Sequence, residues 1–141
     1  IMSNKKTTKI YFYDIDNYIG LITQDKNLAD SYMEFPSFLG VNKTNTDKVF
    51  GTRLKDDFMG NSNMKKGTDV IARYDICPDN DSIVVANIIK DKKIVVRKYK
   101  SDGCLIYLWD NPCDSISTKI VYNKNDIKIL GVVVKAIATI N

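Results

Sequence analysis

Histidine is absent from the 141-residue sequence. Without imidazole the chain cannot form a Ser-His-Asp arrangement, and it lacks both the usual general base near neutral pH and the commonest ligand of catalytic zinc. Its 21 Lys and Arg against 17 Asp and Glu give a net charge of +4, which favours solubility but is weak evidence for a nucleic-acid partner. Any catalysis by this chain therefore depends on other nucleophiles and bases.

Cysteine is scarce, and Cys77, Cys104 and Cys113 form no Cys-x-x-Cys pair. An odd number of such thiols favours reduced, partly buried cysteines in a cytoplasmic protein over a disulfide framework. No further ligands lie at suitable spacing, so we expect no metal and no cofactor. No signal peptide opens the sequence, and the apolar stretches 83–89 and 129–140 are shorter than the roughly 18 residues of a membrane span. We expect a cytoplasmic protein with no membrane partner.

Residues that favour helices are also few. The sequence has 18 Ile and 11 Val but only 5 Ala, 7 Leu and a single glutamate, Glu34. β-branched side chains suit pleated strands, whereas Ala, Leu and Glu are the residues of helices. We therefore predict a mainly β chain, a compact, curled β fold with little helix. The expected strands, each bounded by turn residues, are 9–13, 32–35, 49–55, 69–74, 83–89, 94–99, 104–109, 116–121 and 127–140.

The two ends of the chain differ in composition. Residues 1–9 are polar and basic and are expected to be a linker remnant or a disordered tail, while residues 10–141 form one domain. Residues 14–29 are expected to be a loop. In the second half, turns at 90–93 and 101–103 predict consecutive hairpins.

Two charged clusters each have two interpretations. Asp56 and Asp57 could be an acid pair, but neighbours on a strand point to opposite faces, which favours a solvated strand end. The hairpin 90–100 carries six Lys and Arg against one Asp. It could bind phosphates, although such charge more often protects an exposed hairpin from edge pairing.

The aromatic residues Tyr99, Tyr107 and Trp109 lie close together in the hairpin region. They could form a stacking platform for bases. Buried aromatic side chains next to a turn are the commoner case. Neither the charged clusters nor these rings identify a function by themselves.

The order of several short motifs is more specific. From Val49 the chain reads Val-Phe-Gly-Thr-Arg-Leu-Lys-Asp-Asp-Phe-Met, and Gly67 follows nine residues after Phe58. The later motifs are Asp69-Val70-Ile71-Ala72, Asp81-Ser82-Ile83-Val84-Val85-Ala86, Ile94-Val95-Val96-Arg97-Lys98-Tyr99, Leu105-Ile106-Tyr107-Leu108, Asn111-Pro112 and Ile129-Leu130-Gly131-Val132-Val133-Val134. In this order and spacing, from about Tyr11 to Ile140, the chain resembles the C-terminal domain of the LexA and phage CI repressor family, the self-cleaving Ser/Lys peptidases.

The resemblance implies a degenerate catalytic site. The family's nucleophilic serine falls on Phe58, its general-base lysine on Arg97, and its Ala-Gly cleavage site on Ile19-Gly20. Phenylalanine offers no nucleophile, and arginine keeps its charge and cannot serve as the base. We therefore predict a domain that is not an enzyme and keeps the four residues as vestigial positions. Phe58 should be at least half buried in the old cleft, and Arg97 should meet a carboxylate or backbone carbonyls.

One alternative keeps the activity. Ser62 and Lys98 could form a displaced dyad in an active self-cleaving peptidase. Lys98 follows Arg97 directly, however, and one step along a strand turns a side chain to the other face. A second alternative is a stand-alone homologue, similar to the short polymerase-accessory members of the family.

The family's remaining role is assembly. The resemblance implies the oligomerisation and regulatory domain of a phage or mobile-element transcriptional repressor, with DNA bound only through an N-terminal helix-turn-helix domain absent from these residues. The expected homodimer or higher oligomer uses one face of the last strand, with Val133, Lys135, Ile137 and Thr139. An antirepressor protein, docking at 90–93 or near Phe58, would replace cleavage as the inducing event.

Overall fold

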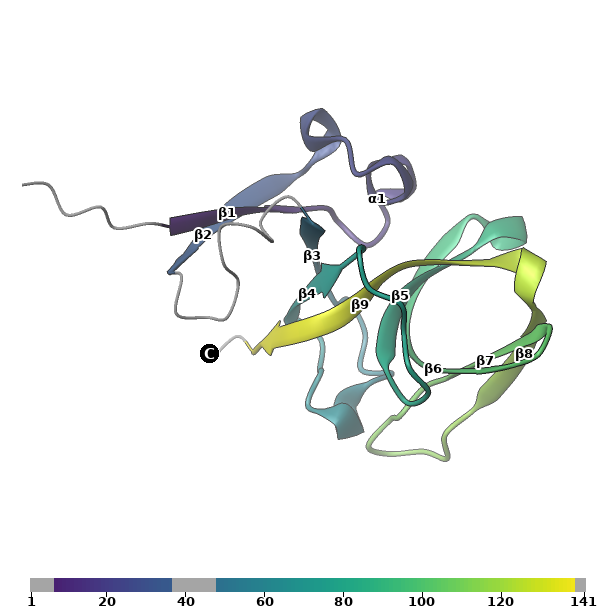
Figure 1. Cartoon of the computed structure of the whole chain (residues 1–141). Helices are drawn as coiled ribbons and strands as arrows, with labels where there is room; N and C mark the ends of the chain where they lie inside the picture. The colour runs from purple at the N-terminus through teal and green to yellow at the C-terminus, as the bar shows by residue number, and fades with distance from the viewer. Residues whose placement is uncertain (1–6, 37–47, 139–141) are drawn as a thin grey trace, which may run out of the picture.

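A computed structural model describes residues 7–36 and 48–138 of the chain (Figure 1). The strands are β1 (Thr7–Phe12), β2 (Ser31–Pro36), β3 (Val49–Arg53), β4 (Asp69–Arg73), β5 (Ile83–Ile88), β6 (Lys93–Asp102), β7 (Leu105–Trp109), β8 (Lys119–Asn123) and β9 (Ile127–Ile137). They form a single mixed sheet in the order β2-β1-β3-β4-β9-β5-β6-β7-β8. The predicted mainly β fold with little helix is confirmed.

The sheet is curled. Figure 1 shows β5, β6, β7 and β8 curving round with β9 into an open ring, while β1 and β2 extend away from it. The pairing is antiparallel except for a short parallel contact between β1 and β3, where Phe12 lies opposite Gly51. β9 pairs with β4 on one side and β5 on the other, so it joins the two halves.

Three apolar clusters form the core. The first gathers residues of β3 to β6, β9 and the segment around Tyr13 and Leu21. The second lies on one face of β5, β6, β7 and β9 and includes Val84, Tyr99 and Leu108. The third joins β1 and β2 to β3 and β4. β9 borders all three, because it lies in the middle of the sheet.

Residues 14–29, predicted to be a loop, contain a short helix, α1 (Tyr18–Thr23), and a 3-10 turn, η1 (Lys26–Leu28). Asn17 caps α1 by accepting from the Gly20 N–H at 3.0 Å, and its amide donates to the Leu28 carbonyl. A short helix with a side-chain cap gives only weak periodicity, so the pattern alone did not reveal it. No helix in the described parts of the chain is long and apolar enough to cross a membrane.

Several predicted boundaries are wrong. β3 ends at Arg53 instead of residue 55, β6 runs on to Asp102 instead of ending at residue 99, and β9 ends at Ile137 instead of residue 140. β1 begins at Thr7 and pairs with β2, so residues 7–9 belong to the sheet and not to a linker; residues 1–6 lie outside the described residues. The strand predicted at 116–121 is β8, which begins at Lys119. Ile116, the β-branched residue at which the strand was predicted to begin, is 90% exposed in the loop before β8.

The face of β9 assigned to the dimer is interrupted by a β-bulge. Val133 pairs with Ala72, but Lys135 pairs with the next residue of β4, Ile71. Adjacent strand residues point to opposite faces, so Val133 lies on the opposite face from Lys135 and Ile137. The prediction that these residues share one face is therefore wrong, because the extra residue at the bulge reverses the alternation. Thr139 lies outside the described residues.

Candidate functional site

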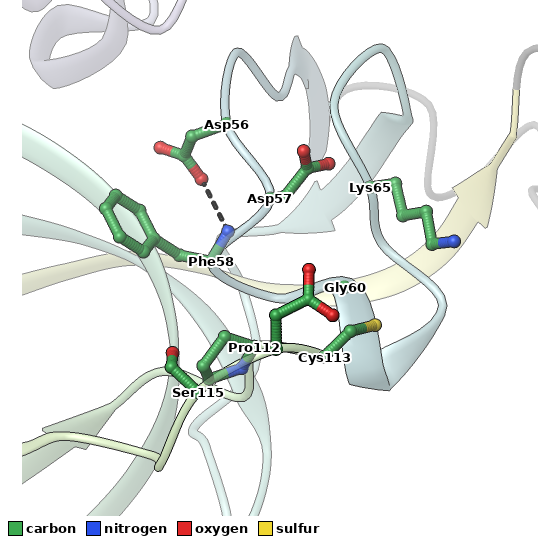
Figure 2. Close-up of a pocket in the computed structure, with 9 residues that line it drawn as sticks. Asp56, Asp57, Phe58, Gly60, Lys65, Pro112, Cys113 and Ser115 are labelled. Carbon is green, nitrogen blue, oxygen red and sulfur yellow. Dashed lines mark hydrogen bonds between the residues drawn. The ribbon is translucent and has the colours of Figure 1, made fainter.

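Phe58 lies in the turn that follows β3. Its backbone N–H donates to the Asp56 carboxylate at 3.1 Å (Figure 2). The carboxylate of Asp57 accepts from the Lys66 N–H at 2.7 Å. Aspartate side chains stabilise turns in this way by replacing backbone acceptors. Both carboxylates are exposed, in agreement with the prediction of a solvated strand end. The turn sets the position from which the Phe58 ring projects.

Arg97, from the middle of β6, meets this ring. Its guanidinium carbon lies 4.9 Å from the centre of the Phe58 ring, within the range of a cation–π contact. The two residues come from segments that are not paired in the sheet. The structure therefore brings together the two positions that the family resemblance assigns to the catalytic dyad.

The Asn111-Pro112 motif reaches the same place. The backbone N–H of Asn111 donates to the Phe58 carbonyl, and the Asn61 N–H donates to the Asn111 carbonyl, both at 2.8 Å. The Asn111 amide also donates to the Ser62 hydroxyl at 2.8 Å. These bonds hold the 58–62 turn against the segment that follows β7. Three motifs that are far apart in the sequence thus converge on Phe58.

The charge of Arg97 is only partly compensated. Burial lowers the pKa of its guanidinium below the ordinary value, while the carboxylates of Asp56 and Asp110 act in the opposite direction. Its Nη1 donates to the Val96 carbonyl at 2.8 Å, which confirms the predicted contact with a backbone carbonyl. A guanidinium held by a carbonyl and a ring stays protonated, so it offers no base.

Two hollows flank Phe58. The larger, about 390 Å³, lies between the 56–60 turn and the segment 112–115, with Lys65 on its rim (Figure 2). The smaller, about 160 Å³, is lined by Arg97 and by Ile15 and Asp16. Phe58 is 46% exposed, so just over half of it is covered, as predicted. It lines both hollows and is not enclosed in a sealed cleft.

The two positions that the family resemblance assigns to the cleavage site lie in α1. Ile19 is 56% exposed and its carbonyl accepts from the Thr23 hydroxyl at 2.7 Å, while Gly20 is buried. Neither residue lines the two hollows. The segment just before α1 does reach the smaller hollow, where Lys55 donates to Asp14 at 2.7 Å and Asp16 at 3.0 Å. The Ile19 carbonyl is thus held within a helical turn, away from Phe58 and Arg97.

The displaced dyad is not assembled. Ser62 accepts from Asn111 beside the larger hollow. Lys98 lies on the opposite face of β6 from Arg97, with its ammonium 5.9 Å from the centre of the Trp109 ring. A serine nucleophile needs its base within hydrogen-bond reach, and in this structure Ser62 and Lys98 each contact another side chain, Asn111 and Trp109 respectively.

The cysteines are free, but all three are exposed, so the prediction of partly buried thiols is wrong. They fall in loops or at a hairpin turn, where backbone exposure outweighs their apolar character. Cys113 lines the larger hollow next to Gly60, where an added Cβ would lie 3.1 Å from its sulfur. Among the described residues, no group of three or more acidic or cysteine side chains could hold a metal.

The aromatic residues of the hairpin region separate. Tyr99 is buried in the second core cluster, whereas Tyr107 and Trp109 point to the opposite face of the sheet. Sequence reasoning grouped them by proximity; the strand alternation of β6 and β7 could have separated them.

Comparison with known proteins adds no relative: no protein-family profile matches the chain, and no curated protein is significantly similar to it.

Proposed function

We propose that this chain is the oligomerisation and regulatory domain of a phage-type or mobile-element transcriptional repressor, with the peptidase chemistry of its fold lost. The observation that carries the proposal is the contact between Phe58 and Arg97. A chance alignment would have no reason to assign the dyad to two residues that touch. Their side chains provide a ring and a cation where the family needs a nucleophile and a neutral lysine.

Loss of self-cleavage is the first testable consequence. Incubating the full chain at alkaline pH should yield no fragment that begins at Gly20, because Phe58 has no hydroxyl to act as the nucleophile and the Ile19 carbonyl accepts from the Thr23 hydroxyl. The double variant Phe58→Ser and Arg97→Lys should remain uncleaved as well, since the bond still lies in α1. Mass spectrometry of both proteins over time measures this. A fragment starting at Gly20 from the unchanged protein would refute the proposed loss of activity.

Assembly is the function that remains. The proposed homodimer or higher oligomer pairs near the end of β9, where Lys135 and Ile137 share a face and Ala136 lies on the other. Lys135→Asp should shift the sedimentation coefficient toward that of a monomer at tens of micromolar. Ala136→Asp, an exposed neighbour on the opposite face, is the matched control and should leave assembly intact. A monomeric unchanged protein, or equal loss in both variants, would exclude this interface.

Regulation follows from the same proposal. DNA would be bound through a helix-turn-helix domain on the N-terminal side, and the repressor would act in the cytoplasm. Without self-cleavage, induction requires an antirepressor protein that favours the state of the repressor that does not bind DNA. The size of its effect cannot exceed the difference between its affinities for the DNA-binding state and for that other state. Pull-down from induced cells with the full-length repressor as bait tests this. Recovery of the repressor alone, together with its cleavage after DNA damage, would contradict it.

A further inference from the structure

The outer side of β6, β7 and β8 carries a regular arrangement of lysines and aromatic rings. Trp109 lies directly between Lys98 of β6 and Lys119 of β8, and Tyr107 lies between Lys100 and Val121. Directly opposed residues of an antiparallel pair point to the same face. We call this surface the lysine–aromatic face, and it consists of Lys98, Lys100, Tyr107, Trp109, Lys119 and Val121.

The described parts of the chain leave this face partly open: Lys100, Lys119 and Val121 are exposed, whereas Lys98 is partly buried. Nearer the start of β6, Ile94 and Val96 are buried in the first core cluster, but from Lys98 onward no residue of the face belongs to a core cluster. Val121 is 49% exposed, and Tyr107 and Trp109 remain partly accessible. A sheet face that leaves two aromatic rings partly accessible is typical of a binding surface.

The lysines lie close to the rings. The Lys98 ammonium is 5.9 Å from the Trp109 ring centre, and the Lys119 ammonium is 5.2 Å from that of Tyr107. Cation–π contacts at accessible sites are weak, and lysine is a flexible point charge. An incoming phosphate can therefore draw each ammonium off its ring and leave the ring face free for a base.

The spacing of the two rings favours a single-stranded over a double-stranded nucleic acid. Tyr107 and Trp109 are two residues apart on one strand, which separates them by about 7 Å along β7. Successive bases of a duplex rise by only about 3.4 Å. Two bases that stack on these rings must therefore be separated from each other, which a single strand allows and a duplex does not.

We propose that the lysine–aromatic face binds single-stranded DNA, with successive bases on Tyr107 and Trp109 and phosphates on Lys98, Lys100 and Lys119. The lysines supply the charge complementarity, and Asp102 marks the end of the positive stretch, opposite Leu105. The residues directly opposite the two rings are lysines and Val121; the carboxylate of Asp102 and the amide of Asn123 lie one pair further along, on either side of Leu105, and the Asn123 side-chain oxygen accepts from the Asn125 N–H. Because no acceptor stands opposite a ring to receive a ribose 2′-hydroxyl, we assign DNA over RNA. This binding is independent of the proposed repressor function.

Trp109 reports the binding directly, because it is the only tryptophan of the chain. Titration of the full chain with a thymidine 12-mer at low salt should quench its fluorescence. A 12-mer of abasic sites, with the same phosphates, should bind at least about fivefold more weakly, since stacking contributes roughly 1–3 kcal/mol per base. A 12-base-pair duplex should also bind more weakly. Equal binding of the abasic strand or the duplex, or uridine 12-mer binding as tight as thymidine, would overturn the proposal.

Lysine variants distinguish binding at the lysine–aromatic face from non-specific attraction to basic charge elsewhere on the chain. Replacing Lys98, Lys100 and Lys119 by Gln should weaken the affinity for a fluorescent thymidine 12-mer at least tenfold. It should also reduce the salt slope of log K by about 2, because about 0.7 counterions are released per neutralised phosphate. The matched control replaces Lys90, Lys92 and Lys93, exposed lysines of the turn between β5 and β6, and should change affinity less than twofold.

The rings need their own variant. Tyr107→Ala should weaken binding about fivefold while leaving the salt slope unchanged, since no charge is removed. Circular dichroism of each variant verifies that the fold persists. An equal loss in the Lys90, Lys92 and Lys93 variant, or full affinity in Tyr107→Ala, would show that the face is not a site and would overturn the inference.

Discussion

The two faces of the β6–β7–β8 ribbon both carry cations next to aromatic rings, but these pairs lie in different surroundings. On the inner face, Arg97 lies against Phe58 and donates to the Val96 carbonyl, next to the buried Tyr99. On the outer face, Lys98 and Lys119 lie over the rings of Trp109 and Tyr107 with no core beneath them. Both faces pair cations with aromatic rings, but Arg97 on the inner face is partly buried, whereas Lys100 and Lys119 on the outer face are exposed.

The difference shows that burial, more than residue type, decides the role of such a pair. Arg97 and Lys98 are neighbours in the chain but lie on opposite faces, and burial on the inner face lowers the pKa of the Arg97 guanidinium. The Phe58–Arg97 pair occupies a former catalytic position in our proposal, while the outer lysines remain available to a ligand. Substitutions on the inner face should therefore lower mainly the free energy of unfolding, whereas substitutions on the outer face should lower mainly the affinity for a ligand.

The largest contrast is expected for two leucines of β7. Leu108 is 3% exposed in the second core cluster, while Leu105 is 39% exposed on the outer side. Leu108→Ala should lower the free energy of unfolding by about 3 kcal/mol, because it leaves a cavity among packed side chains. Leu105→Ala should lower it by less than about 1 kcal/mol. Urea denaturation measures both, and similar values would mean that the two faces are not distinguished by packing.

A smaller contrast is expected between the two cation–aromatic pairs. A double-mutant cycle with Phe58→Ala and Arg97→Met should give a coupling energy of about 1 kcal/mol, since the guanidinium is partly desolvated. The cycle with Tyr107→Ala and Lys119→Met should give about 0.5 kcal/mol or less, because water screens the exposed pair. Unfolding free energies of the seven proteins, with the unchanged protein common to both cycles, provide the test. A larger coupling on the outer face would reverse the comparison.

The smallest effect concerns Tyr122 of β8, which packs against the second core cluster. Burial, and secondarily Asp91, raises the pKa of its phenol above 10.0. The unfolded chain then loses this proton first, so the contribution of Tyr122 is complete below pH 10 and declines as the pH rises above that value. Stability measured from pH 9 to 11 should fall more steeply for the unchanged protein than for Tyr122→Phe. Parallel curves would show that the phenol is not withdrawn from water.

Several properties followed from residue types alone. The abundance of Ile and Val and the shortage of Ala, Leu and Glu predicted the mainly β fold, because side-chain branching acts locally on the backbone. The absence of a hydroxyl at Phe58 and of a neutral base at Arg97 is a matter of chemistry that no fold can change. The turns between β5 and β6 and between β6 and β7 were likewise readable from short polar segments.

Other features depended on partners distant in the sequence. The bulge in β9 arises from its pairing with β4, so alternation within β9 could not show that Val133 leaves the face of Lys135. The cap of α1 involves a network from Asn17 to Leu28 and Asp30 across a predicted loop. Local pattern carries no information about such long-range hydrogen bonds.

Composition and local pattern therefore determined which strands this chain could form and that Phe58 and Arg97 offer neither a hydroxyl nor a neutral amine. Only the tertiary structure decided that Phe58 contacts Arg97, that Asn111 holds the 58–62 turn, and that Tyr107 and Trp109 share a partly open face with three lysines. The physical reason is that strand propensity belongs to a few adjacent residues, whereas register, bulges and sheet curvature are set by pairing between segments far apart in the chain.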